Sequence, residues 1–163
     1  MLRWSLIGFL LIMFFPQVCL SKTKYDDEYT TVLCPENWNI QVKFSSNQTT
    51  FVASGITCED LYISMIHKSP TDSNLNSHEA WARIRKYLID GKTVLLEGSE
   101  EINGVTWKKL KIKYSTIGAN YVMMMYFVML NGNSHLIQFN TEAHSFKNTI
   151  MTFDEFMNSV VLK

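Results

Sequence analysis

The pattern of apolar and polar positions centres on residues 121–130 (YVMMMYFVML), where apolar side chains fill consecutive positions. Because successive side chains of a strand point to opposite faces, both faces of such a strand are apolar. The aromatic and Val content, and the Asn131-Gly132-Asn133 turn that follows, favour a strand over a buried helix. The stretch therefore predicts the central strand of a sheet that is covered by a layer on each side.

Shorter patterns predict further strands around this centre. The cleanest alternation of apolar and polar residues runs from Trp38 to Phe44 and is typical of a half-buried strand. Residues 22–30 are polar and predict a loose lead-in. Short strands are expected at 30–34, 51–53, 60–67, 93–102, 105–115 and 136–140.

Apolar residues at helical spacing predict two helices, over residues 77–90 and from Ser145 to Val160. Glu79 follows Asn76 by three residues, which resembles a capping box at the start of the first helix. Gly91 suits the left-handed position that follows the end of this helix.

Turn residues predict how the strands pair. Asn103-Gly104 is the strongest hairpin signal, because a type I′ turn needs positive φ at both central positions. Trp107 has odd parity whereas Leu110 has even parity, which predicts a β-bulge near Lys108-Lys109. Strands joined by tight turns over 93–142 are antiparallel. We expect an α+β fold in which helices cover both faces of an antiparallel sheet, a three-layer α/β/α sandwich.

Several of these features together resemble the PsbP-like fold family, including its small exported bacterial members. The resemblance covers residues 30–163. It rests on Pro35-Glu36-Asn37-Trp38, the helix over 77–90, Glu101-Ile102-Asn103-Gly104, the long apolar strand, Asn131-Gly132, and Phe156-Met157-Asn158-Ser159-Val160. The resemblance implies an antiparallel sheet sandwiched by helices, and an accessory or binding role in place of catalysis. No binding motif matches, so no functional residue is transferred.

The beginning of the chain has the pattern of an export signal. Arg3 precedes an apolar run over residues 4–15, which Pro16 ends, and cleavage is expected after Ser21. The protein is then an exported, periplasmic or secreted chain with a signal peptide over 1–21 and a single α+β domain over 22–163. Retention of the segment as an anchor and lipidation of Cys19 are the rival interpretations.

Export bears on the cysteines. Beyond the signal segment the chain keeps Cys34 and Cys58, and an oxidising compartment favours one disulfide between them. The alternative is a pair of buried free thiols.

Charge and motifs exclude several classes of function. The 15 basic and 15 acidic residues balance, which argues against nucleic-acid binding. His67, His78, His135 and His144 show no close metal-ligand spacing. There is no nucleophile elbow, P-loop or dinucleotide fingerprint, so we expect no catalytic residue, no metal and no cofactor.

One run of residues is a candidate interaction surface: Trp107, Lys108, Lys109, Lys111 and Lys113. It would suit an acidic partner or the headgroups of a membrane surface, and its alternative is a solvated strand face. The methionines of the central strand have two interpretations: they line an adaptable ligand pocket, or they fill the core of the sheet. The sequence thus predicts an exported, non-enzymatic accessory or binding protein acting through a protein-interaction surface. The alternative is a carrier of a small apolar ligand or lipid, held between helix and sheet. The partner and the oligomeric state stay open.

Overall fold

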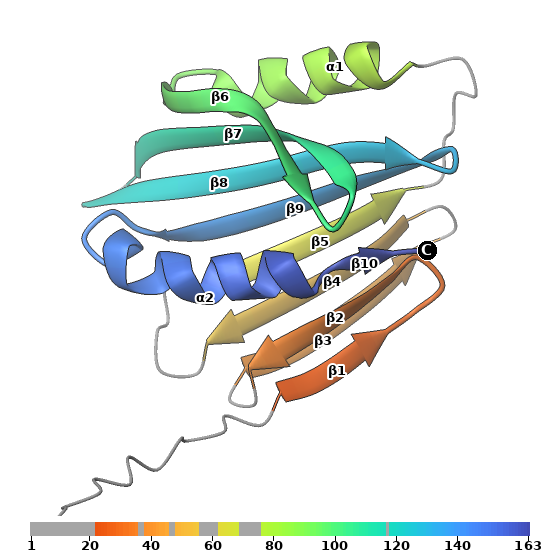
Figure 1. Ribbon diagram of the computed structural model, residues 1–163. Coiled ribbons are helices and arrows are strands. Elements are labelled where there is room, and N and C mark those ends of the chain that lie inside the picture. The colour runs from red at the N-terminus through yellow and green to blue at the C-terminus, as the bar shows by residue number, and fades with distance from the viewer. Residues whose placement is uncertain (1–21, 36–37, 46–47, 56–61, 69–75, 117) are drawn as a thin grey trace, which may run out of the picture.

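The fold is a large antiparallel sheet, a smaller second sheet and two helices, as a computed structural model shows (Figure 1). The structure describes residues 22–35, 38–45, 48–55, 62–68, 76–116 and 118–163. Its elements are β1 (Lys22–Asp26), β2 (Thr30–Pro35), β3 (Trp38–Ser45), β4 (Gln48–Gly55), β5 (Tyr62–Lys68), α1 (Ser77–Ile89), β6 (Thr93–Ile102), β7 (Val105–Thr116), β8 (Ala119–Leu130), β9 (Asn133–Glu142), α2 (Phe146–Ser159) and β10 (Val161–Leu162).

The strands pair in two antiparallel sheets. One has seven strands in the order β3-β4-β5-β9-β8-β7-β6, and the other has three in the order β1-β2-β10. The meander of β6, β7, β8 and β9 follows the chain, as tight turns require. The predicted α+β class with antiparallel strands and two helices is confirmed.

β8 is buried on both faces, as its apolar run predicts. Met125 and Phe127 are fully buried on one face, and Met124 and Tyr126 on the other are at most 4% exposed. In the register, β8 lies between β7 and β9, inside the sheet. The unbroken run of apolar residues therefore reflects an interior strand with packing on each side.

Two hydrophobic clusters lie against the large sheet. Beneath α1, Trp81 packs with Leu110, Ile112, Met125 and Phe127. The other and larger cluster contains residues of β8, of α2 and of the second sheet, among them Met124, Tyr126, Phe153, Phe156, Val32 and Cys34. Figure 1 shows α2 lying across the large sheet and leading directly into β10. Residues of α2 and of the second sheet thus belong to one cluster, which the sequence did not predict.

Local signals at the helix ends and turns are confirmed. Asn76 Oδ1 accepts hydrogen bonds from the backbone N–H groups of His78 and Glu79, and the capping box is complete. Gly91 has a φ of +66°, beyond the end of α1. The hairpin residues Asn103 and Gly104 have φ values of 52° and 75°, as a type I′ turn requires.

The prediction of a loose lead-in at residues 22–30 is wrong. Residues Lys22–Asp26 form β1, which pairs with β2, and β10 pairs with the other edge of β2. The polar sequence of β1 carries no periodic apolar signal, so this strand forms through pairing with its neighbour. Its place depends on tertiary structure, which a local pattern does not encode.

The predicted bulge near Lys108-Lys109 is also wrong. The register between β7 and β8 runs without a break, and the irregularity lies between Val94 and Leu96 on β6. Trp107 belongs to the cluster beneath α2, whereas Leu110 belongs to the cluster beneath α1. The change of parity therefore arises because β7 buries different faces at different points along its length.

No helix in the part of the chain that the structure describes is long and apolar enough to cross a membrane. The predicted signal segment, 1–21, lies outside the described residues.

Candidate functional site

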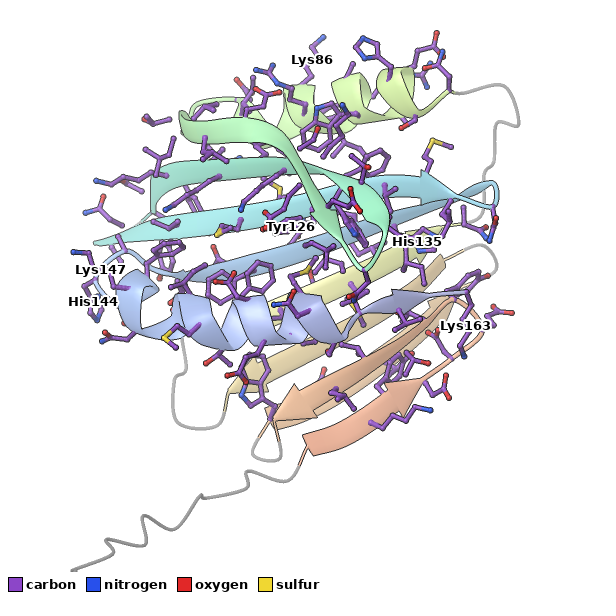
Figure 2. The ribbon with its side chains drawn as sticks, in the orientation of Figure 1. Lys86, Tyr126, His135, His144, Lys147 and Lys163 are labelled. Atoms are coloured by element: carbon purple, nitrogen blue, oxygen red, sulfur yellow. The ribbon has the colours of Figure 1, made fainter. Side chains whose placement is uncertain are left out.

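A charged cleft lies where the β6–β7 hairpin meets the C-terminal half of α2. It has a volume of about 280 Å³. Its lining residues come from β6, β7, β8 and α2, and they are Glu100, Ile102, Lys109, Tyr126, Asp154, Met157 and Asn158. In Figure 2, Tyr126 lies on β8 close to α2, whereas Lys86 projects from α1 away from the sheet.

The type I′ turn places the charged groups of the hairpin. It sets Glu100 opposite Trp107, so Lys109 lies two residues further along the same face of β7. The register with β8 then sets Lys109 directly opposite Tyr126. Side chains from three neighbouring strands therefore meet on one face of the sheet.

The hairpin tip is joined to the end of α2. The Asn103 side-chain Nδ2 donates hydrogen bonds to the carbonyl oxygens of Asn158, at 3.0 Å, and Val160, at 2.8 Å. Carbonyls at a helix C-terminus have no partner within the helix, so this side chain acts as a cap from another element. These bonds hold β6 and β7 close to α2 and so define one end of the cleft.

Glu100 is the centre of a hydrogen-bond network. Its Oε2 accepts hydrogen bonds from Lys109 Nζ, at 2.6 Å, and from the Tyr126 hydroxyl, at 2.9 Å. The bond from Lys109 lowers the pKa of Glu100, although partial burial opposes this effect. Burial alone would lower the pKa of Lys109, but Glu100 and Tyr126 outweigh it and the pKa is raised. The ammonium group also lies 5.3 Å from the centroid of the Tyr126 ring. At neutral pH Glu100 and Lys109 therefore both carry a charge, and the pair has no net charge.

Asp154 differs from Glu100, because no described residue forms a hydrogen bond or an ion pair with its carboxylate. Burial raises the pKa of Asp154, the charge of Lys109 opposes the rise, and the charge of Glu100 adds to it. The cleft thus holds one uncompensated negative charge beside a neutral pair.

The pKa values of Tyr126 and Glu100 are both shifted away from neutral pH. Burial raises the pKa of Tyr126 to about 12, so its hydroxyl keeps its proton. Glu100 is shifted in the other direction and keeps its charge. A general acid or base works best with a pKa near the working pH. Neither Tyr126 nor Glu100 therefore has a pKa suited to proton transfer at neutral pH.

The structure separates the residues of the predicted interaction surface. Trp107 is only 1% exposed and lies in the core, so it is not part of any surface. Lys108 is exposed near Ser99, on the face opposite Lys109. Lys111 lies over the Phe146 ring, with its Nζ 3.8 Å from the centroid, and Lys113 is exposed. Of the predicted residues, only Lys109 lines the cleft.

Cys34 is a buried free thiol, and burial raises its pKa to about 11. No disulfide occurs among the residues that the structure describes. Cys58 lies outside them, so the Cys34–Cys58 pair stays a prediction.

The histidines are spread over the fold. His78 is exposed on α1, and His144 is exposed with its Nδ1 2.8 Å from Glu142 Oε2. His135 is buried and directly opposite His67 in the register of β9 and β5; the side chain of His67 lies outside the described set. Within the described ranges, no group of three or more His, Cys, Asp or Glu residues could hold a metal ion.

Four polar residues of the cleft were not predicted as site residues from the sequence: Glu100, Tyr126, Asp154 and Asn158. A signal for Glu100 was present, because the register that Asn103-Gly104 imposes puts it on the same face as Lys109. No local signal existed for Asp154, because its approach to the cleft depends on where α2 packs.

Comparisons with known proteins find similarity in structure only. No family model matches the chain, and no curated protein matches it. The cyanobacterial PsbP (CyanoP) of Synechocystis sp. PCC 6803 is similar with a TM-score of 0.62 and 13% identity, over 99% of this chain and 98% of that chain. The Ran-binding protein Mog1p of Saccharomyces cerevisiae is similar with a TM-score of 0.56 and 14% identity, over 88% of this chain and 96% of that chain. LpqN of Mycobacterium tuberculosis, which is involved in cell envelope biogenesis, is similar with a TM-score of 0.51 and 9% identity, over 88% of this chain and 91% of that chain.

These similarities establish the fold. The chain has the PsbP-like fold, which the Mog1 structure shares, and the resemblance expected from the sequence is confirmed at that level.

Proposed function

We propose that this chain is an exported, non-enzymatic accessory protein that binds a protein partner at the cleft between the β6–β7 hairpin and α2. The observation that carries the proposal is the uncompensated Asp154 carboxylate beside the Glu100–Lys109 pair. A charge that is not paired within the chain favours recognition of a complementary surface. The similar structures include a protein described as Ran-binding, which supports a binding role on this fold.

A binding role agrees better with the site than catalysis does. The pKa shifts of Tyr126 and Glu100 move both groups away from neutral pH, and the Cys34 thiol is buried and protonated. A nucleophilic cysteine needs a lowered pKa and access to substrate. These properties support a protein without enzymatic activity.

The cleft also supports a protein partner over an apolar ligand. Its volume of about 280 Å³ lies at the lower end of the range of roughly 300–1,000 Å³ typical of small-molecule pockets. Its lining is mainly polar, and Phe153 stacks on Phe139 at 4.5 Å where α2 meets the sheet. The alternative of a carrier with an apolar gap at that interface therefore has less support.

We also propose the three-layer α/β/α arrangement, with α1 and α2 on opposite faces of the large sheet. Its support is the separation of Trp81 and Phe153 into different hydrophobic clusters. Adjacent residues of β8 contribute to the two clusters in turn, as side chains of one strand do on opposite faces.

Site-specific photo-crosslinking tests the interaction surface. A photoreactive residue replaces Asn158, which is exposed at the cleft, or Tyr87, which is 79% exposed on α1 and is the matched control. We expect the full-length protein, expressed in its own cell, to form a defined adduct from position 158 that position 87 does not form. Mass spectrometry identifies the adduct. Identical adducts from both positions, or none from position 158, would contradict the proposal.

Export is tested separately. Mass spectrometry of the N-terminus should find a chain that begins at Lys22, because cleavage is expected after Ser21. A chain that keeps Met1 in a membrane fraction would instead support an anchor, and a lipid on Cys19 would support a lipoprotein.

A further inference from the structure

We infer that the cleft receives a single basic side chain, a lysine or an arginine of the partner, between the carboxylates of Asp154 and Glu100. This rests on the proposed function and adds the chemistry of the group that is recognised. The charge balance of the lining carries the inference. Glu100 and Lys109 neutralise each other through a 2.6 Å ion pair, and Asp154 is left without a partner among the described residues.

The internal cation does not satisfy both carboxylates. Lys109 Nζ bonds to Glu100 Oε2, and its charge acts on Asp154 only at longer range. Glu100 Oε2 already accepts two hydrogen bonds, whereas no described residue donates to its Oε1. A second cation would therefore find one carboxylate oxygen of Glu100 and the whole carboxylate of Asp154 as acceptors. Charge-assisted hydrogen bonds of this kind are stronger than neutral ones.

A metal ion fits this cleft less well than an organic cation. No described group of three or more His, Cys, Asp or Glu residues could hold a metal ion, so a metal would lack ligands here. An ammonium or guanidinium group needs only a few oriented acceptors and carries a single charge. The volume of about 280 Å³ matches the end of one long side chain better than a larger ligand.

A free amine would gain little here, which is why the cation belongs to a protein. An exposed or partly exposed ion pair contributes up to about 1 kcal/mol, or about five-fold in affinity. Contacts around the exposed rim, which includes Asn158, have to supply the rest of the binding energy. Those contacts are available when the basic group is part of a larger surface.

The first test uses small probes on the full-length protein. Nα-acetyl-arginine amide and Nα-acetyl-lysine amide are titrated against ¹⁵N-labelled protein, with Nα-acetyl-citrulline amide as the uncharged control of similar shape. We expect at least one basic probe, at a concentration high enough to populate a weak ion pair, to shift the amide signals of Asp154 and Asn158. The citrulline probe should not shift them. Equal binding of all three probes, or no shift at the cleft with either basic probe, would overturn the inference.

Two matched variants test the role of the carboxylate. Asp154→Asn removes the charge and keeps the shape, and should weaken the basic probe by up to about five-fold. Glu101→Gln removes the same charge from an exposed residue next to Glu100 that does not line the cleft, and should leave the affinity unchanged. The amide spectrum of each variant without probe checks that it folds. An unchanged affinity in a folded Asp154→Asn protein would overturn the inference.

The photo-crosslinking experiment distinguishes failure of this inference from failure of the proposed function. With the photoreactive residue at position 158, Asp154→Asn should lower the yield of the partner adduct. An unchanged yield would keep the docking surface and reject the basic side chain. Absence of any adduct in the parent protein would reject the proposed function, and the probe titration would still decide the chemistry of the cleft.

Discussion

Shortening Phe127 and Met124 measures how the two faces of β8 are packed. Phe127 is fully buried, and its ring stacks on Trp81 with 5.8 Å between centroids and 23° between planes. Met124 is 4% exposed and belongs to the other cluster, which contains α2 residues such as Phe153. Each truncation therefore removes core contacts on one face and leaves the other face intact.

The structure sets the expected magnitudes. Phe127→Ala should lower the free energy of unfolding by about 3–5 kcal/mol, because a buried ring is lost and a cavity remains. Met124→Ala should lower it by about 2–5 kcal/mol for the same reason. A typical domain has only about 5–15 kcal/mol in total, so either change removes a large part of the stability. Phe127→Ala should lower the Tm by roughly 10 °C.

The assay is urea denaturation followed by circular dichroism, with a double-mutant cycle. Trp81→Ala and Phe127→Ala should couple by about 0.5–1.5 kcal/mol, because the two rings stack. Trp81→Ala and Met124→Ala should be additive within about 0.5 kcal/mol, because these residues lie in different clusters. Tyr87→Ala, at a side chain that is 79% exposed, is the control and should change stability by less than about 0.5 kcal/mol.

Two results would refute this account. A neutral Met124→Ala together with a large effect of Phe127→Ala would mean that the sheet is packed on one face only. A coupling of Trp81 with Met124 as large as that with Phe127 would mean that the two clusters are one.

Three further predictions concern the hairpin, the cleft and the thiol. Asn103→Gly keeps the positive φ but loses both hydrogen bonds to the carbonyl groups at the end of α2, and should lower the free energy of unfolding in urea by about 1–2 kcal/mol. Asn131→Gly loses a single hydrogen bond of 3.3 Å and is the control. An equal decrease in the control would contradict this prediction. The pKa of Asp154 is raised in the folded state, so its negative charge destabilises the fold at neutral pH. Asp154→Asn should therefore have a slightly larger free energy of unfolding than the parent at pH 7, and should lose this advantage as the pH falls towards the ordinary Asp pKa of about 3.9. A difference in the free energy of unfolding that is constant at all pH values would contradict this prediction. Iodoacetamide should modify Cys34 only after the protein is unfolded, because the thiol is buried in the folded state. Peptide mass spectrometry without reductant measures the modification. If Cys34 stays unmodified after unfolding, it is bonded to Cys58.

Much of the fold could be predicted because its signals are local. The apolar run of β8 requires cover on both faces, and Asn103-Gly104 requires a tight hairpin, whatever the rest of the chain does. Asn76 and Glu79 fix the start of α1 in the same way. The second sheet as a whole could not be predicted, because β1 has no periodic apolar pattern and β10 reaches β2 from the far end of the chain.

The candidate site was predictable only in part, for the same physical reason. Lys109 was identified within a basic run, but strand geometry places Lys108 on the opposite face and Trp107 in the core. Registers set by tight turns could have paired Lys109 with Glu100 and Tyr126. The position of Asp154 depends on the packing of α2 against the sheet, and no periodicity in the chain encodes it.

The pairing of β2 with β10 has a consequence for the order of folding. The Thr30 hydroxyl donates a hydrogen bond to the carbonyl oxygen of Val161, 131 residues away, and the Lys163 backbone N–H donates to the carbonyl oxygen of Tyr29. Such non-local contacts form slowly, because a long loop must close before they contribute. The β1–β2 hairpin is only marginally stable alone, so the small sheet should be completed late, after the meander of β6 to β9 has formed. Until then one edge of β2 stays open, and the chain passes through a state in which that edge can pair with another strand.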